Sequence, residues 1–213
     1  MSLGADSRAE AFHRATDEVS DSDLEWMVLP LEDLPKALTD FEIGREGPLD
    51  NATMAEHGFP GQTVESIEEI GRITGYVREM IPSQLDEVSL GDVVTAGVVV
   101  HLFRDHRGVA QWIDDVFLKE FIANAGRIRD GGYELEHAEE LAIDGFHGKS
   151  AAVFAVHGVP NGTLGSTIVD FAVGRVLGVA FVVVLGETQD LDLAKDLALK
   201  LERQVVSVAL GSV

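Results

Sequence analysis

The sequence contains no cysteine among its 213 residues. This absence excludes disulfide bonds, thiolate nucleophiles, iron–sulfur clusters and cysteine-ligated zinc. It does not decide the compartment, because proteins without cysteine occur inside and outside the cell. The amino-terminal string MSLGADSRAE also lacks the basic region and apolar core of a signal peptide. A cytoplasmic protein and an exported protein whose leader has been removed therefore both fit the sequence.

Basic residues are scarce as well. Sixteen lysines and arginines stand against 37 aspartates and glutamates, which gives a formal net charge of −21. Binding to nucleic acid or to anionic lipid requires a local concentration of positive charge, and the basic residues here are scattered. We therefore expect no nucleic-acid partner. The acidity favours solubility, and it also fits cationic partners, weakly bound divalent cations or a saline environment.

One apolar stretch, IVDFAVGRVLGVAFVVVLGE at residues 168–187, is about long enough to cross a bilayer. As a membrane helix it would bury the charges of Asp170 and Arg175, each of which is costly at membrane depth. Gly174 and Gly178 would also interrupt the helix, and valine dominates where leucine and alanine suit a helix better. The sequence therefore predicts no transmembrane segment here.

The same stretch has the composition of a β-hairpin. Residues 166–173 and 178–185 are two β-branched runs, and the segment 174–177 between them begins with a glycine suited to a turn. We expect Arg175 to lie in water at the tip of this turn. The four apolar residues at 182–185 are consecutive, so both faces of that strand must be covered.

Two further segments have the periodicity of amphipathic helices, residues 106–126 and residues 188–210. Alternating or β-branched runs predict the remaining strands at residues 71–81, 92–103, 133–143 and 147–157, with a short helix at residues 63–70. Hairpin connections make the sheet mostly antiparallel. The order of elements predicts an α+β fold, a mostly antiparallel sheet of about six strands between helices, which is an α/β/α sandwich.

The chain divides unevenly. Residues 1–23 are polar and acidic, so we expect a flexible or loosely docked segment, followed by a single α/β/α sandwich domain at residues 24–213. Pro30 and Pro35 predict an extended entry into this domain followed by a short turn, and residues 44–62 read as a loop with about one helical turn.

The strings PLEDLPKAL and GRITGYVREM, together with the closing hairpin and helix, resemble uncharacterised bacterial proteins related to the PsbP-like fold. The resemblance covers about residues 24–210. It implies an α/β/α sandwich with an antiparallel sheet, as in the photosystem accessory subunit that names the fold. It also implies a non-enzymatic role, because members of this fold generally dock on protein partners or assist assembly, and several bacterial members are exported lipoproteins.

The predicted strand at 71–81 carries the best local candidates for ligand binding. With a period of two, Arg72, Tyr76 and Arg78 share one face, where they could hold a carboxylate or another anion. The alternative is that both arginines pair with acidic neighbours beneath a covering helix.

Other chemistry finds little support in the sequence. The seven histidines are scattered, and two of them ten residues apart on one strand would lie about 33 Å from each other, so we expect no metal site. There is no GxSxG elbow, and GVPNGTLG at 158–165 reads as a turn between strands. We predict no catalytic residues and no cofactor.

Three functions remain open. The first is a non-catalytic binding or accessory module that engages a protein or peptide partner, or associates with itself. The second is a carrier of a small apolar ligand, similar to helix-grip proteins, in which the small residues of SAAVFAVHG and STIVDFAVG leave room for a cavity. Coverage of the sheet on both faces is expected to leave no such cavity. The third is a hydrolase or another enzyme with an unrecognised site.

Overall fold

The sheet is built from strands that pair as two antiparallel meanders. The computed structural model describes residues 3–84, 88–128 and 134–211, and within these ranges eight strands form one sheet in the order β1-β2-β3-β8-β7-β6-β5-β4. Every neighbouring pair is antiparallel. The strands are β1 Phe41–Pro48, β2 Arg72–Pro82, β3 Val93–Phe103, β4 Arg127–Ile128, β5 Glu134–Leu141, β6 Ser150–Val159, β7 Gly162–Val173 and β8 Val176–Leu185.

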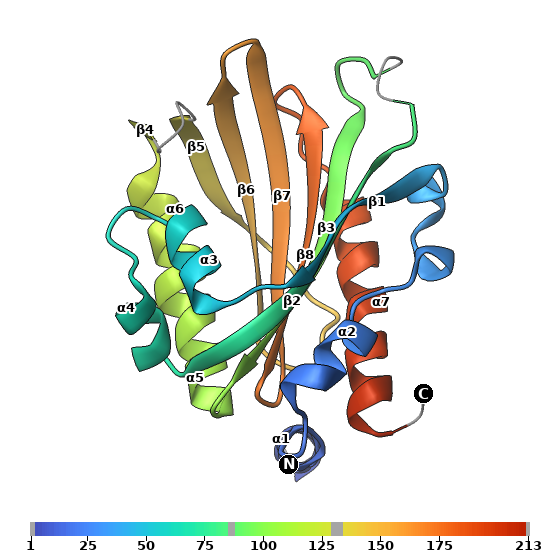
Figure 1. Ribbon diagram of the computed structural model, residues 1–213, viewed down its shortest axis with the longest axis vertical. Helices are drawn as coiled ribbons and strands as arrows, with labels where there is room; N and C mark the ends of the chain where they lie inside the picture. The colour runs from blue at the N-terminus through green and yellow to red at the C-terminus, as the bar shows by residue number, and fades with distance from the viewer. Residues whose placement is uncertain (1–2, 85–87, 129–133, 212–213) are drawn as a thin grey trace.

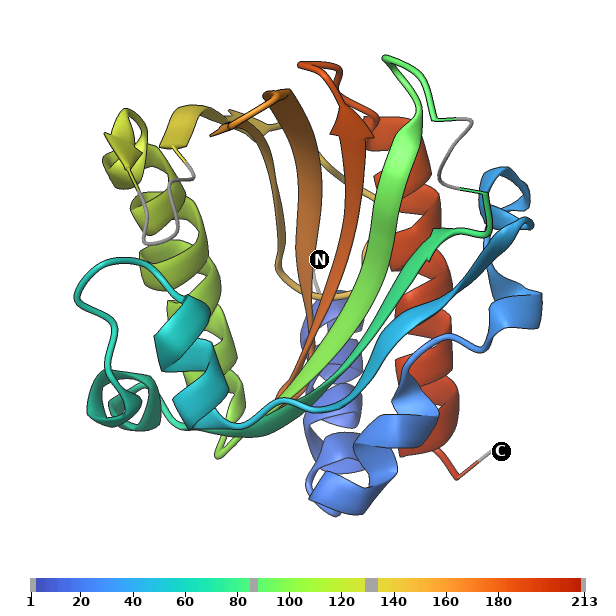
Figure 2. The same cartoon turned by 45° about the horizontal axis from the view of Figure 1, so that its top comes forward.

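Helices cover the sheet on both faces (Figure 1). The long helix α7 packs on one face through leucine and valine side chains that are fully buried. A helical run of α5, η5 and α6 packs on the other face, joined there by the short helices α3 and α4. These elements are α3 Asn51–His57, α4 Val64–Glu69, α5 His106–Gln111, η5 Trp112–Leu118, α6 Lys119–Asn124 and α7 Leu191–Ala209. The predicted α+β fold with a sheet between helices is confirmed, and Figure 2 shows how strongly the sheet twists.

The apolar stretch at 168–187 folds back on itself as β7 and β8. The turn between them is two residues long, because Gly174 adopts a φ of +56° and Val176 already pairs with Val173. The predicted hairpin is thus confirmed, with a tighter turn than the four residues expected. Among the described residues, no helix is both long enough and apolar enough to cross a membrane.

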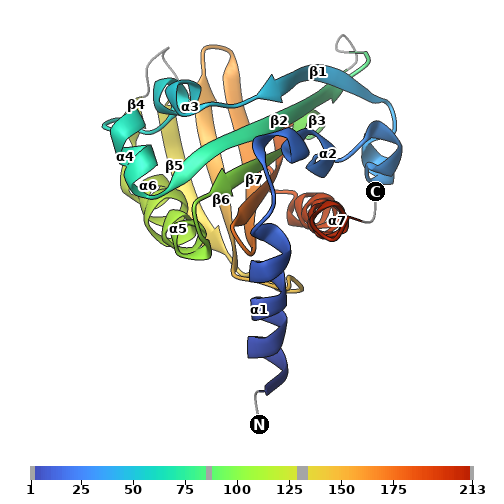
Figure 3. The ribbon, with the colours of Figure 1, turned by 60° about the horizontal axis from the view of Figure 1, so that its bottom comes forward.

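Arg175 does not lie in water at the tip of that turn, as the sequence suggested. Its guanidinium donates hydrogen bonds to the main-chain oxygens of Thr16 (2.8 Å), Val19 (2.6 Å) and Phe103 (3.1 Å). Unpaired carbonyl groups at the end of helix α1 (Leu3–Thr16) attract this cation. The contact ties α1, which projects away from the sheet in Figure 3, to the tip of the hairpin.

The connection between β5 and β6 spans residues 142–149, so Asp144 and Gly145 do not form the tight hairpin that this dipeptide favours. The loop is held instead by buried Glu202 of α7, whose carboxylate accepts a hydrogen bond from the main-chain N–H of His147 at 2.9 Å. The short helix predicted at 63–70 is present as α4, and the side chain of Thr63 caps its start by accepting a hydrogen bond from the main-chain N–H of Ser66.

The entry into the sheet consists of several short turns, where the sequence predicted an extended stretch and one short turn. Three 3-10 turns and one short helix precede β1, and two of the turns follow Pro30 and Pro35 directly. These elements are η1 Asp21–Asp23, α2 Leu24–Met27, η2 Leu31–Asp33 and η3 Lys36–Leu38. The division into a flexible segment 1–23 and a domain 24–213 stays a prediction.

Candidate functional site

A pocket of about 230 Å³ lies between the sheet and the helices α3, η5 and α6. We call it the helix–sheet pocket. It is larger than a cavity of about 150 Å³ that holds benzene, and smaller than the range of about 300–1,000 Å³ typical of drug-sized ligands. The sheet contributes His101, Ile168, Asp170 and Val179, and the helices and the loop after α3 contribute Met54, His57, Gly58, Phe59, Gln62, Trp112, Val116, Phe117 and Phe121.

The helix wall of the pocket is π-helical. The seven residues of η5 follow α5 without a break, and the wider π turn places Trp112, Val116 and Phe117 at the pocket. A π-helical segment is less stable than a regular helix and is frequently found at functional sites. The sequence predicted a regular amphipathic helix at 106–126, whose apolar stripe contains Val116 and Phe117, and the burial of these two side chains is confirmed.

Asp170 is the most unusual residue of the lining. Its side chain is only 2% exposed, between Val169 and Phe171 on β7 and opposite Val179 on β8. Within the described part of the chain it makes no hydrogen bond and no ion pair. Burial raises the pKa of the Asp170 carboxyl well above its usual value of 3.8. A buried carboxyl without a partner is costly, and such exceptions in a native structure point to a role that the folded chain alone does not satisfy.

A buried cluster behind the pocket holds His101 in place. Arg72 donates from Nε to His101 Nδ1 at 3.0 Å, from Nη2 to the main-chain oxygen of Leu49 at 2.7 Å, and from Nη1 to Asn51 Oδ1. Asn51 returns a hydrogen bond to the main-chain oxygen of Arg72. Because Leu49 and Asn51 lead into α3, this cluster also fixes α3 against the sheet. The helix that closes the pocket is therefore positioned by one arginine.

The charge of Arg72 sets the protonation of His101. Burial lowers the pKa of Arg72 to about 9, opposed by Asp50, so the guanidinium is charged at neutral pH. Burial and the adjacent Arg72 lower the pKa of His101 well below 6.5, so its ring is neutral. An arginine can only donate, so Nδ1 accepts and the ring proton is on Nε2. Within the described residues this N–H has no acceptor, and His101 thus offers one free donor at the pocket.

The structure separates the three residues that the sequence placed on one face. A register shift between Arg72 and Thr74 turns Arg72 toward His101, away from the face of Tyr76 and Arg78. Arg78 pairs with Glu46 at 2.7 Å and donates to a main-chain oxygen. The arrangement expected from strict alternation, with all three around one anion, is therefore not formed, because the β-bulge changes the alternation.

The histidines are scattered over the fold, and not all of them lie at its surface. His101 is 4% exposed, and His147 contacts buried Glu202 at 3.0 Å. His13 of α1 stacks on His106 with ring centroids 3.9 Å apart. No group of three potential ligands is placed to hold a metal ion among residues 3–84, 88–128 and 134–211.

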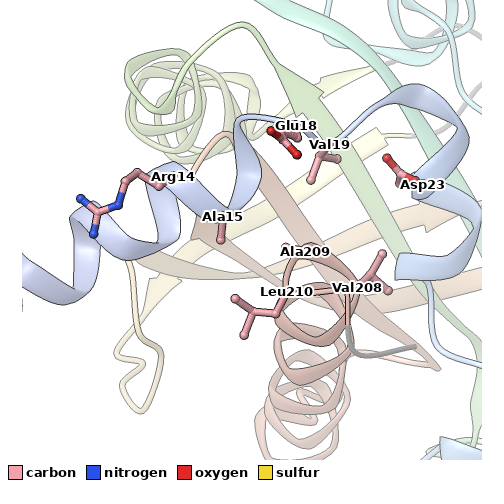
Figure 4. Close-up of a pocket in the computed structure, with 9 residues that line it drawn as sticks. Arg14, Ala15, Glu18, Val19, Asp23, Val208, Ala209 and Leu210 are labelled. Atoms are coloured by element: carbon pink, nitrogen blue, oxygen red, sulfur yellow. The ribbon is translucent and has the colours of Figure 1, made fainter.

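A second pocket, of about 410 Å³, lies between α1, the segment that follows it as far as Asp23 of η1, and the end of α7 (Figure 4). Its charged side chains, Arg14, Glu18 and Asp23, are not buried, and the carboxylate of Asp23 already accepts hydrogen bonds from Ser20. Solvent and neighbouring groups satisfy this surface. The helix–sheet pocket, at which the buried carboxyl of Asp170 and the buried Nε2–H of His101 are unsatisfied within the described residues, is the stronger candidate.

Sequence reasoning missed Asp170 and His101 as site residues, and it named Arg72 without foreseeing the contact of Arg72 with His101. A signal for Asp170 was present, since it is the one carboxyl inside an apolar strand that is covered on both faces. The Arg72–His101 contact had no such signal, because it depends on a bulge and on two strands 29 residues apart in sequence.

Comparisons with known proteins identify a solved structure with a similar fold. No family model matches the sequence, and no curated protein matches it. Among solved structures, the chain is similar to the extracellular domain of PknH from Mycobacterium tuberculosis, with 10% sequence identity and a TM-score of 0.59. The match covers 88% of this chain and 96% of that chain. At this identity the likeness establishes that the two chains share a fold.

Proposed function

We propose that this protein is a non-catalytic binding module that takes up one small, largely apolar molecule in the helix–sheet pocket. One observation carries the proposal: two buried polar groups, the carboxyl of Asp170 and the Nε2–H of His101, lie at a largely apolar pocket and have no partner among the described residues. Ligand sites are typically apolar clefts with a few such polar groups. A ligand that pairs with both groups would remove the cost of burying them.

The lining favours binding over catalysis. Of the described residues that line the pocket, none carries a hydroxyl, a thiol or an amine that could act as a nucleophile. Asp170 and His101 make no hydrogen bond to each other, so they do not form the base and orienting acid of a catalytic site.

This proposal develops the carrier hypothesis, with one correction. Coverage on both faces was expected to leave no cavity, and that expectation was wrong. A straight helix stays close to a twisted sheet over only part of its length, and α3 closes the space that remains. The pocket lies on the face away from α7, whereas a helix-grip cavity would lie beneath that helix.

The alternative of a protein or peptide partner stays a prediction. The edge strand β1 does not favour addition of a partner strand, because it carries a bulge, Pro48 and several charged side chains. The resemblance to PsbP-like proteins also stays a prediction. An exported location is compatible with the fold, since the similar domain of PknH is extracellular.

Trp112 allows a direct test of the proposed function. It lines the pocket and is 6% exposed, and the second tryptophan, Trp26, is 59% exposed. In a Trp26→Phe background, fluorescence therefore reports on the pocket alone. We expect small aromatic compounds to change this fluorescence, and Val179→Phe, which fills the space beside Asp170, to abolish the change.

A matched control is Ile73→Phe, an enlargement of similar kind at a side chain that is 44% exposed and outside the pocket. It should bind the same compounds as the background protein. Equal binding by the Val179→Phe variant would show that the compounds bind elsewhere, and it would remove the basis of the proposal. Native mass spectrometry of the freshly purified protein should also show a bound mass that this variant lacks.

A further inference from the structure

We infer that the ligand of the helix–sheet pocket is a small organic ammonium ion, with Asp170 as its counter-ion. This inference rests on the proposed function and adds the chemical class of the ligand. It follows from three features of the lining: the sign of its charge, its aromatic side chains and the free donor of His101.

The first feature is a carboxyl that lacks a cation. Asp170 is the acidic residue of the described lining, and no lysine or arginine belongs to that lining. Arg72 does not fill this role, because its donors are directed to Leu49, Asn51 and His101. Desolvation is the cause of the perturbed pKa of Asp170, and no neighbouring cation opposes it. A cation at this position must therefore arrive with the ligand.

The second feature is a wall of aromatic rings. Phe59, Trp112, Phe117 and Phe121 all line the pocket, and Phe121 makes edge-to-face contacts with Phe59 at 4.9 Å and with Phe117 at 5.6 Å between centroids. The faces of such rings attract organic cations, most strongly where water is excluded. The same rings also accommodate the apolar body of a ligand, so an amine on a single ring or short chain suits a space of about 230 Å³.

The third feature is the N–H of His101, which can bind an oxygen of the ligand. Arg72 fixes the tautomer, so His101 presents Nε2–H and cannot act as an acceptor. An ammonium ion that also carries a hydroxyl or carbonyl oxygen would satisfy both buried groups. An anionic ligand could pair with His101, but it would repel Asp170 in the carboxylate form and could therefore bind only while this carboxyl is protonated, whereas an ammonium ion pairs with the carboxylate. The net charge of −21 also raises the local concentration of cations over anions.

Binding has a defined proton balance. In the free protein, burial raises the pKa of the Asp170 carboxyl and so favours its protonated form. A bound ammonium ion stabilises the carboxylate, so the carboxyl proton passes to the buffer when the cation enters. Calorimetry in buffers with different enthalpies of ionisation should therefore detect release of a proton for a cationic ligand and none for a neutral one.

Three probes of nearly equal size test the inference: 2-phenylethylammonium, 2-phenylethanol and phenylacetate. Their affinities are measured by Trp112 fluorescence in the Trp26→Phe background and in the same background with Asp170→Asn. We expect the ammonium probe to bind the parent best and the carboxylate worst. In the asparagine variant the ammonium affinity should fall by about tenfold or more, as expected for loss of a charged hydrogen bond, with the affinity for the alcohol nearly unchanged. Unchanged binding of the alcohol also shows that the variant is folded.

Two outcomes would overturn the inference in different ways. If the alcohol binds the parent as tightly as the ammonium, or if Asp170→Asn keeps the preference for the ammonium, the ligand class is wrong and the proposed function stands. If none of the three probes binds, or if Val179→Phe leaves their binding intact, the helix–sheet pocket is not a binding site and both proposals fail.

Discussion

Replacing Asp170 by valine is expected to stabilise the fold. The carboxyl is 2% exposed, unpaired among the described residues, and flanked by Val169 and Phe171. Mutational data put the cost of burying a polar group without a hydrogen bond at about 1–3 kcal/mol, and the variant should recover that amount. For a domain of this size, each kcal/mol raises Tm by about 2–4 °C. Valine also suits a β-strand, and its extra volume can occupy the adjoining pocket.

The gain should depend on pH in a defined direction. Burial raises the pKa of Asp170 in the folded state above the value of 3.8 in the unfolded chain. A group whose pKa is raised by folding contributes its full stabilisation at pH values below its pKa in the unfolded chain. This contribution is lost as the pH rises through the pKa of the group in the folded protein. Between these two values the wild type loses up to about 1.4 kcal/mol per pH unit relative to the valine variant.

Urea denaturation of the wild type, Asp170→Val and Asp170→Asn at a series of pH values measures both effects. The asparagine variant, which keeps the shape and removes the titration, should lose the pH dependence and gain less stability than valine. A valine variant less stable than the wild type, or a difference between the two proteins that is constant with pH, would refute the reasoning. It would mean that the carboxyl has a stabilising partner in the folded chain.

Three further predictions concern contacts around the sheet. Gly75→Ala places a Cβ 2.7 Å from Nη2 of Arg72, so it should destabilise the fold by about 1–3 kcal/mol in urea denaturation. Arg175→Ala removes the contacts that hold α1, and we expect a loss of about 1.5–3 kcal/mol with faster amide exchange in α1. Burial and the adjacent His106 lower the pKa of His13, and two nearby carboxylates partly oppose this shift. The stabilisation from the stacked pair is therefore present above 6.5, the pKa of histidine in the unfolded chain, and is lost as the pH falls below that value. Urea denaturation at pH values on both sides of 6.5 should show this loss in the wild type and less of it in His106→Gln.

The elements that the sequence predicted well are those with a strong local pattern. The hairpin of β7 and β8 was readable because valine runs and Gly174 are incompatible with a helix, and α7 was readable from its apolar stripe. Two strands were missed, so the sheet has eight strands within the described ranges instead of about six. β1 contains Gly44, Gly47 and Pro48 and lies at the edge, and β4 has only two residues, so neither shows a periodic pattern.

The site was less predictable than the fold because it depends on contacts between distant segments. Arg72 reaches Asn51 and His101 only because a bulge reverses its side of β2, and a bulge leaves no mark in composition. The π-helical turns of η5 have no sequence signal either. Asp170 was noticed as an obstacle to a membrane helix, although its isolation in a covered strand already marked it as a group in need of a partner.

The order of the strands has a consequence for synthesis on the ribosome. β3 lies in the middle of the finished sheet, yet its neighbour β8 begins only after β4 to β7 have been made. Until then the valine-rich edge of β3 is unpaired, and its main-chain N–H and C=O groups can form hydrogen bonds with a strand of another chain. The sheet formed by β1, β2 and β3 therefore lacks its neighbouring strand until β8 has been synthesised. The nascent chain is most prone to aggregation while β8 is still inside the ribosome.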